Sequence, residues 1–175
     1  SKCYPRLHEI GAVRGGDYFG NYHSDQPEGG YYRREEVREI VDYCGQFGIE
    51  VVPEIDMPGH VTAILAAYPE LSCAGEPVEV GMRAGIFKEL FCAGKEETFA
   101  FIHNLLDELL ELFPGKYFHI GGDEAPKERW RACPYCQKRM KEEGFQNEQE
   151  LQGYFCNRIA SYLLSKGRIP IVWNE

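Results

Sequence analysis

Two adjacent carboxylates, Asp123 and Glu124, are the residues of this chain that most directly suggest chemistry. They end the stretch KYFHIGGDE, in which an apolar run and two glycines lead into both acids. Carboxyl groups act as general acids, general bases or nucleophiles when they are held beside a reacting bond. The same pair also suits a purely structural role, because Asp123 can cap a following helix and Glu124 can complement its dipole.

Two other apolar runs also end in polar side chains. The stretch IEVVPEIDMPGH supplies Glu54, Asp56 and His60, and RIPIVWNE supplies Trp173 and Glu175. If the three runs are parallel strands, these residues meet at the carboxyl edge of one sheet, where the active sites of α/β proteins lie. Taken singly, His60 reads equally well as a helix cap and Trp173 as a core residue, so the prediction rests on their combination. His119 alternates with apolar neighbours and is expected to be hydrogen-bonded inside the sheet.

Consecutive acids restrict the chemistry. Glycosidases commonly place two carboxyl groups on opposite sides of the scissile bond, which neighbours at one strand end cannot easily do. A substrate-assisted reaction removes this conflict, because the 2-acetamido group of the sugar then acts as the nucleophile. One carboxyl group protonates the leaving oxygen, and its neighbour orients the acetamide and stabilises the positive charge of the cyclic intermediate.

The elements that must position these residues alternate along the chain. Apolar periodicity predicts helices from residue 33, over 61–68, 95–113 and 125–143, and from residue 147. Short apolar runs predict strands over 49–56, 116–122 and 168–175, and residues 1–32 and 69–94 are predicted as long loops. Strands alternating with helices are typical of a parallel α/β sheet with right-handed crossovers.

The chain of 175 residues is long enough for a real core. We predict one piece of a larger parallel α/β protein over 1–175, without an internal domain boundary, because three strands are too few for a closed sheet. Exposed strand edges favour self-association.

A net charge of −9 argues against nucleic-acid binding and gives no reason to expect membrane binding. We expect the parent protein to be periplasmic or secreted, although these 175 residues contain no signal peptide.

The seven cysteines are scattered. Cys73 and Cys92 bracket a polar loop that a disulfide bond would close, and Cys133 and Cys136 form a single CxxC. A lone CxxC without a second pair or nearby histidine ligands favours a structural pair or a local disulfide over zinc. We therefore expect no cofactor and no metal.

The ordered motifs VPEIDMPGH, HIGGDE and VWNE resemble the catalytic domain of family 20 β-N-acetylhexosaminidases across essentially the whole chain. The resemblance implies a partial (β/α)8 TIM barrel, roughly strands 3 to 5 with their helices. It implies hydrolysis of terminal non-reducing β-linked N-acetylhexosamine residues with retention, and N-acetylhexosamine-containing glycans as partners.

The resemblance also implies roles for single residues. Glu124 matches the general acid/base, Asp123 the carboxylate that orients the acetamide, and His60 a histidine that supports the acid. Trp173 resembles an aromatic wall of the acetamido pocket, and Glu175 is expected to bind substrate beside it. Supporting positions behind them are expected for Glu54, Asp56 and His119.

The family's sugar-binding arginine and its later tryptophans and tyrosine have no counterpart here, so an isolated chain of these residues is expected to be inactive or nearly so. One alternative is a metal-dependent hydrolase that uses Asp56, His60, Asp123 and Glu124 as ligands. The other is a non-catalytic carbohydrate-binding module, whose sugar-stacking residues would come from the aromatic first loop: Tyr18, Phe19, Tyr22, Tyr31 and Tyr32.

Overall fold

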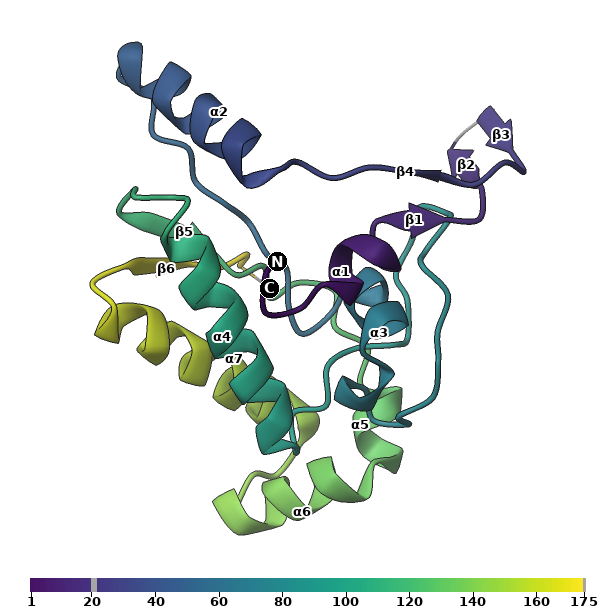
Figure 1. Cartoon of the computed structure of the whole chain (residues 1–175). Helices are drawn as coiled ribbons and strands as arrows, with labels where there is room; N and C mark the ends of the chain where they lie inside the picture. Colours follow the sequence, from purple (N-terminus) through teal and green to yellow (C-terminus); the bar gives the residue numbers. More distant parts are fainter. Residues whose placement is uncertain (20–21, 175) are drawn as a thin grey trace.

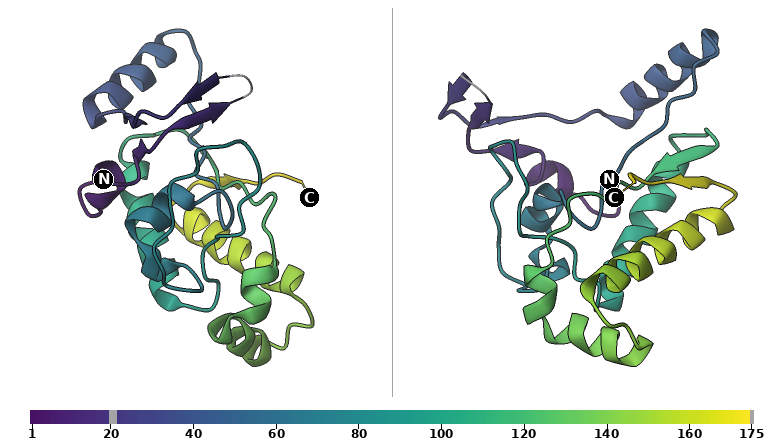
Figure 2. Two further views of the ribbon diagram at one scale, coloured as in Figure 1. Left: turned by 90° about the vertical axis from the view of Figure 1, so that its right-hand side faces the viewer. Right: turned by 180° about the vertical axis from the view of Figure 1, so that it is seen from behind.

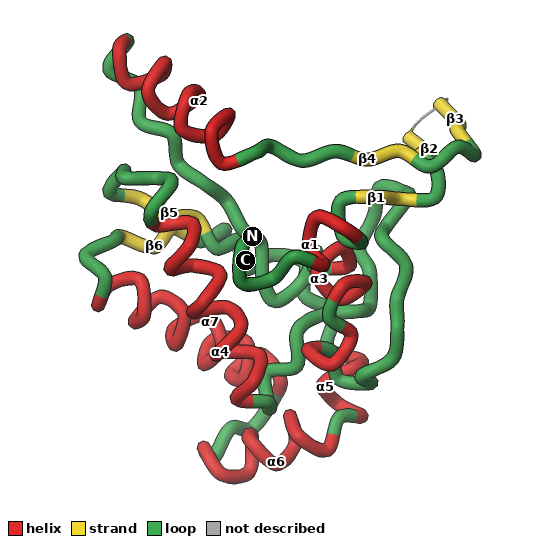
Figure 3. Tube along the Cα trace, viewed as in Figure 1, coloured by secondary structure: helices red, strands yellow, loops and turns green. Residues whose placement is uncertain are grey.

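The computed structural model describes residues 1–19 and 22–174, with the side chains of all of these except residues 17–19 and 22. It is a mixed α/β structure in which long loops join short strands and helices (Figures 1 and 3). The side chains of Tyr18, Phe19 and Tyr22, and the whole of Glu175, lie outside the described part.

The parallel strands lie side by side as predicted. β5 (Tyr117–His119) pairs in parallel with β6 (Ile169–Ile171). On the other side of β5, Glu54 forms a parallel bridge with His119. The segment predicted over 116–122 therefore lies between the other two.

The strand predicted over 49–56 is reduced to that single bridge, and this part of the prediction was wrong. Pro53 interrupts the segment, and proline has no N–H to offer to a ladder of hydrogen bonds. Ile49 and Val52, expected to be buried, are exposed to 57% and 40%. The segment behaves as an extended connection that meets the sheet only at its end.

Two long helices of the chain pack against one face of the strands. The helices that follow the N-terminal region are α2 (Arg34–Gln46), α3 (Thr62–Ala67), the 3-10 turn η1 (Pro69–Leu71), α4 (Glu96–Leu110), α5 (Glu128–Ala132), α6 (Pro134–Glu143) and α7 (Glu148–Ser165). α4 and α7 lie side by side beneath β5 and β6 (Figures 1 and 2). Phe99, Ile102 and Leu106 of α4 are buried, as the predicted apolar stripe requires, and they share the core with Phe155 and Ile159 of α7.

The single helix predicted over 125–143 is divided in two. α5 ends at Ala132 and α6 begins at Pro134. Pro134 cannot donate a hydrogen bond to α5, and it disfavours helical backbone at the residue before it. Cys133 accordingly has an extended ψ of 118° and forms the junction between the two helices.

Residues 1–32 are more regular than the predicted loop. They contain α1 (Arg6–Glu9) and two short antiparallel pairs, one of β1 (Val13–Arg14) with β4 (Glu28–Gly29) and one of β2 (Asp17–Phe19) with β3 (Tyr22–Ser24). Two-residue and three-residue strands leave little periodicity in the sequence, which is why none was predicted. α1 packs against α3, whereas the β2–β3 pair and α2 project away from the packed helices (Figure 1).

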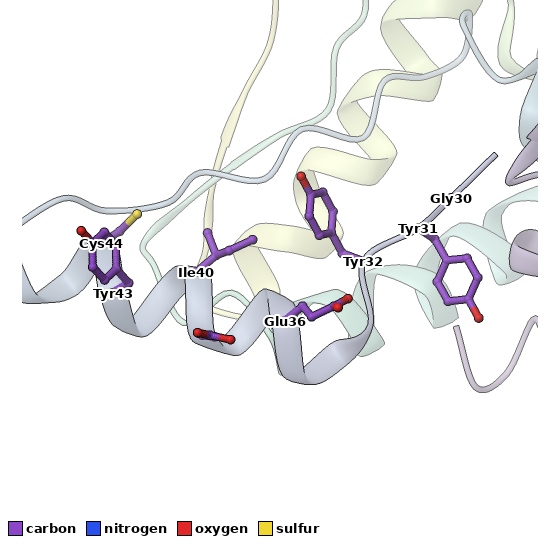
Figure 4. A pocket seen from close by; sticks show the side chains of 8 residues that line it. Gly30, Tyr31, Tyr32, Glu36, Ile40, Tyr43 and Cys44 are labelled. Carbon is purple, nitrogen blue, oxygen red and sulfur yellow. The ribbon is translucent and has the colours of Figure 1, made fainter. Parts of the chain in front are cut away.

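The apolar face of α2 is uncovered. None of its residues is buried, and Ile40, Tyr43 and Phe47 (which follows the helix) are exposed to 40%, 61% and 63%. Figure 4 shows an open pocket along this face, with Tyr31 and Tyr32 at its end pointing in different directions. The rings of Tyr31 and Tyr32 therefore do not form one shared stacking surface. Within the described residues, no helix is long and apolar enough to cross a membrane.

Candidate active site

The turn after β5 is built around two glycines with positive φ angles, 68° at Gly121 and 104° at Gly122. A Cβ atom on Gly121 would lie 1.7 Å from Oδ1 of Asp56, so no other residue fits there. The N–H of Gly122 donates to the same Oδ1 atom over 3.1 Å. The glycines thus bring the chain against the carboxylate of Asp56 immediately before Asp123 and Glu124.

Glu124 and His60 contact each other from two strained positions. Among the described residues they are the two non-glycine residues with positive φ, 46° for Glu124 and 54° for His60. Nε2 of His60 lies 3.2 Å from Oε2 of Glu124. Such backbone angles cost free energy and persist where the surrounding structure fixes them, often at functional sites. The strain therefore marks the contact that the sequence predicts for the general acid and its supporting histidine.

Asp123 points to the same histidine but is more enclosed. Its Oδ2 atom lies 4.0 Å from Nε2 of His60, and its side chain is 23% exposed against 44% for Glu124. Its Oδ1 atom is buried, with no nitrogen or hydroxyl donor among the described residues. The Asp56 carboxyl, when protonated, hydrogen-bonds to Asp123. When Asp56 is ionised, a buried acceptor without a donor is costly, so this oxygen is suited to an N–H group supplied by a ligand.

Asp56 is the third carboxyl group of the cluster. Burial is the largest cause that raises its pKa, to about 6, and the charge of nearby Asp123 adds to the increase. The N–H of Gly122 and the charge of His60 act in the opposite direction. Ligand atoms of Asp56, His60 and Asp123 lie within 4.8 Å of one another, a spacing that the metal-dependent alternative also requires. Glu124, its fourth proposed ligand, is not part of that group.

Glu54, His119 and Trp173 form a second group beside the acids. The indole N–H of Trp173 donates to Oε1 of Glu54 over 2.9 Å. Nδ1 of His119 lies 3.4 Å from the same oxygen and accepts a hydrogen bond from the N–H of Gly121. The rings of His119 and Trp173 are 4.7 Å apart. The indole is held in one orientation by these contacts while 51% of Trp173 stays exposed.

The predicted site residues are thus brought together, with the exception of Glu175, which lies outside the described part. The sequence also allowed Asp123 and His60 to act as helix caps, and neither does so. α5 begins at Glu128, five residues after Asp123, so Asp123 does not cap it. α3 follows Val61 as its N-cap, without a side-chain cap from His60.

Two residues that hold the turn were missed by the sequence interpretation. Gln152 of α7 is buried, and its amide donates to the carbonyl of Gly122 over 2.6 Å. The Lys127 ammonium donates to the carbonyl of Ala125 and to the Gln152 side chain. No motif marks either residue, although a glutamine on the core-facing side of α7 is a detectable signal.

An open cleft borders the cluster. It has a volume of about 780 Å³ and is lined by His60, Thr62 and Ala63 on one side. Gly11, Arg14 and other residues of the N-terminal region line the opposite side. A ligand that reaches the carboxylates through this cleft would contact the β1–β4 pair as well.

Carboxyl groups and a histidine at the end of parallel strands, beside an exposed indole, are the arrangement of a hydrolytic α/β catalytic domain acting on a polar substrate. Comparison with known proteins makes this specific. Residues 1–175 match the glycosyl hydrolase family 20 catalytic domain, and the chain belongs to that family.

Related sequences and solved structures support the same family assignment. A β-hexosaminidase of Porphyromonas gingivalis is 47% identical over 175 residues, a region covering 99% of this chain and 22% of the relative. The crystal structure of a β-N-acetylhexosaminidase matches with a TM-score of 0.91 and 40% identity, covering 98% of this chain and 36% of that one. An exo-β-N-acetylglucosaminidase of Vibrio harveyi, solved in complex with N-acetylglucosamine, matches with a TM-score of 0.83 and 31% identity over 99% of this chain and 28% of that one. The chain therefore spans between about a fifth and just over a third of these proteins' lengths.

Proposed function

We propose that the protein containing this chain removes terminal β-linked N-acetylhexosamine residues from the non-reducing ends of glycans. The reaction would retain the anomeric configuration and use the substrate's acetamido group as the nucleophile. Membership of the family supports hydrolysis of such sugars. The solved relative with bound N-acetylglucosamine supports this class of substrate.

The observation that supports the mechanism is the enclosed environment of the Asp123 carboxylate. Its enclosed Oδ1 atom has no nitrogen or hydroxyl donor among the described residues, and the residue adjoins Glu124 in the sequence. In the proposed reaction the acetamide N–H donates to Asp123, which holds the carbonyl oxygen below the anomeric carbon. That oxygen attacks, the bond to the leaving group breaks, and Asp123 stabilises the positive charge of the cyclic intermediate.

Glu124 would provide the proton for the leaving oxygen. Its carboxyl group is the more exposed of the pair and contacts His60 at 3.2 Å. After the leaving group departs, Glu124 would accept a proton from the water that opens the cyclic intermediate. His60 would act as a positioning residue, because it contacts both acids and reaches no bond of the substrate in this scheme.

We further propose that residues 1–175 form one piece of a (β/α)8 barrel, roughly strands 3 to 5, with no internal domain boundary. Two observations support this: the parallel pairing of β5 with β6 and with the bridge at Glu54, and the match to solved family members. The piece alone is proposed to have little or no activity, because the substrate-binding residues implied by the resemblance for other strands are absent from it. Its uncovered strand edges and the open face of α2 favour self-association.

The test is an assay of the full-length protein on p-nitrophenyl N-acetyl-β-glucosaminide, with Asp123→Asn and Glu124→Gln as variants. A thiazoline that mimics the cyclic intermediate serves as the inhibitor. We expect turnover that falls with both substitutions and is blocked by the thiazoline. Turnover indifferent to both carboxylates would contradict the proposal. Turnover that depends on added metal and on Asp56 would support the metal-dependent alternative.

A further inference from the structure

Four cysteines converge at a point that the proposed reaction does not use. The Sγ atoms of Cys73, Cys92, Cys133 and Cys136 all lie within 4.8 Å of one another. They come from three segments: the turn after η1, the end of the loop that precedes α4, and the first turn of α6. Cys92, Cys133 and Cys136 are buried, and Cys73 is partly exposed.

The distances are those of ligands around one ion. Sγ of Cys92 lies 3.6 Å from that of Cys136 and 3.7 Å from that of Cys133, and Sγ of Cys73 lies 3.8 Å from that of Cys136. A zinc–sulfur distance of about 2.3 Å in a regular tetrahedron places the sulfurs about 3.8 Å apart. A disulfide bond would require about 2.05 Å. The thiols are free in this structure, so neither the Cys73–Cys92 nor the Cys133–Cys136 disulfide considered from the sequence is present.

We propose that these four cysteines bind one structural zinc ion in a closed tetrahedral site. Zinc is the divalent ion that four thiolates in this geometry favour, and closed four-cysteine sites are structural because they leave no position for substrate. The cleft beside Cys73, about 160 Å³ and lined by Glu89 and Arg129 among others, gives the ion a path from solvent.

Contacts around the cluster align its segments before any ion binds. The Lys95 ammonium donates to the carbonyls of Glu70 and Ser72, over 2.8 and 2.7 Å, and lies 5.4 Å from the ring centre of Tyr135. A Cβ atom on Gly94 would lie 2.2 Å from the carbonyl carbon of Tyr135, so glycine permits this close approach of two backbones. A positive charge beside the cluster also suits a site whose four thiolates exceed the charge of one zinc ion.

The site was missed because its second pair is not a motif. Cys133 and Cys136 form a CxxC, but Cys73 and Cys92 are separated by eighteen residues and come together only through the fold. Ser72 and Phe91 pair as an antiparallel bridge, which places Cys73 and Cys92 at diagonal positions on either side of it. Two closely spaced cysteine pairs make a zinc site recognisable in a sequence. The ion itself needs only four ligands that are close together in space.

The proposed ion would connect the loop over 72–95 to the start of α6. The same loop is fixed to α5 by the indole N–H of Trp130, which donates to the carbonyl of Phe91 over 2.9 Å. α5 begins four residues after Glu124. The ion would therefore stabilise the support behind the candidate active site, while the reaction itself does not use it.

The first measurement is the metal content of the full-length protein, purified without chelator and with any affinity tag removed. We expect one zinc ion per chain by mass spectrometry of the elements. Cys92→Ser should lose the ion and lower the Tm by more than roughly 5 °C. Cys44→Ser, a cysteine outside the cluster, is the matched control. Asp123→Asn must also keep the ion, because Asp56, His60 and Asp123 form the other group that would hold a metal.

A second measurement does not depend on the folding of a variant. Chelator-treated wild-type protein loaded with Co²⁺ should show thiolate-to-cobalt charge-transfer absorption, and zinc should displace it. Wild-type protein that binds neither ion would overturn the proposal. So would peptide mapping after denaturation without reductant that finds Cys73, Cys92, Cys133 and Cys136 in disulfide bonds. Stoichiometric iron in place of zinc would confirm the site and correct the metal.

Discussion

The carboxylate cluster and the cysteine cluster lie at the two ends of one short segment, residues 123–136, and are built in opposite ways. Glu124 and His60 adopt strained backbone angles, and their side chains stay partly open to solvent. The cysteines of the other cluster are mostly buried, and positive φ occurs at none of the four. The contact proposed to protonate the leaving group is held under strain and stays partly exposed, whereas the thiols proposed to hold an ion are mostly enclosed. Substitutions at the two clusters should therefore separate activity from stability.

The largest effect is expected for Glu124→Gln, which removes the proposed proton donor. We expect kcat/KM on a disaccharide substrate to fall about 1000-fold, within the range of general acid catalysis. The loss should be smaller on the p-nitrophenyl substrate, because its leaving group departs without protonation. Equal losses on both substrates, measured with purified full-length protein of unchanged Tm, would contradict the acid role.

Asp123→Asn should lower kcat/KM about 100-fold, in line with the loss of one group that stabilises developing charge. Here the loss should be similar on the two substrates, because Asp123 is proposed to act on the acetamide and not on the leaving group. The comparison of leaving groups thus distinguishes the two neighbours. A loss confined to the disaccharide would assign proton transfer to Asp123 instead.

Gly121→Ala tests how the carboxylate cluster depends on the backbone turn that precedes it. The new methyl group would overlap Oδ1 of Asp56, and alanine disfavours the positive φ of this position. We expect the free energy of unfolding to fall by about 3 kcal/mol. The activity of the folded protein should fall as well, because the turn before Asp123 must shift. Denaturant titration and active-site titration with the thiazoline give the two readouts.

Gly94→Ala is the matched substitution at the cysteine cluster. Its methyl group would overlap the backbone of Tyr135, so we expect a destabilisation of about 2 kcal/mol. The kcat of the molecules that remain folded should be close to that of the wild type. A kcat that falls as far as in Gly121→Ala would show that the two clusters are not separable in function.

The smallest effect is expected from Asp56→Asn and depends on pH. Because the pKa of Asp56 is raised to about 6, the folded state binds a proton that the unfolded state has released between about pH 4 and pH 6. The stability of the wild type relative to Asp56→Asn should therefore fall as pH rises through this window and stay constant above it. Thermal melts of both proteins at pH 4, 5, 6 and 7 measure the difference. A rise with pH would show that Asp56 is stabilised in its charged form.

The sequence predicted the carboxylate cluster better than the elements around it. Strand ends in a parallel sheet share an edge, so the positions of Asp123, His60 and Trp173 followed from the order of apolar runs. The boundary between α5 and α6 at Pro134 and the loss of the strand at Pro53 both follow from the chemistry of proline. The prediction of these elements from apolar periodicity did not take that chemistry into account. The cysteine cluster depends on contacts between distant segments, and single-sequence patterns do not contain that information.

The strained backbone at His60 and Glu124 has a consequence for efforts to make this protein more robust. Glu124→Gly would relieve the unfavourable φ and is expected to raise the melting temperature while it removes the proposed proton donor. A directed-evolution campaign that selects only for survival on heating would accordingly enrich inactive variants at these two positions. Screening for residual turnover in every round, or holding both codons fixed, avoids that outcome.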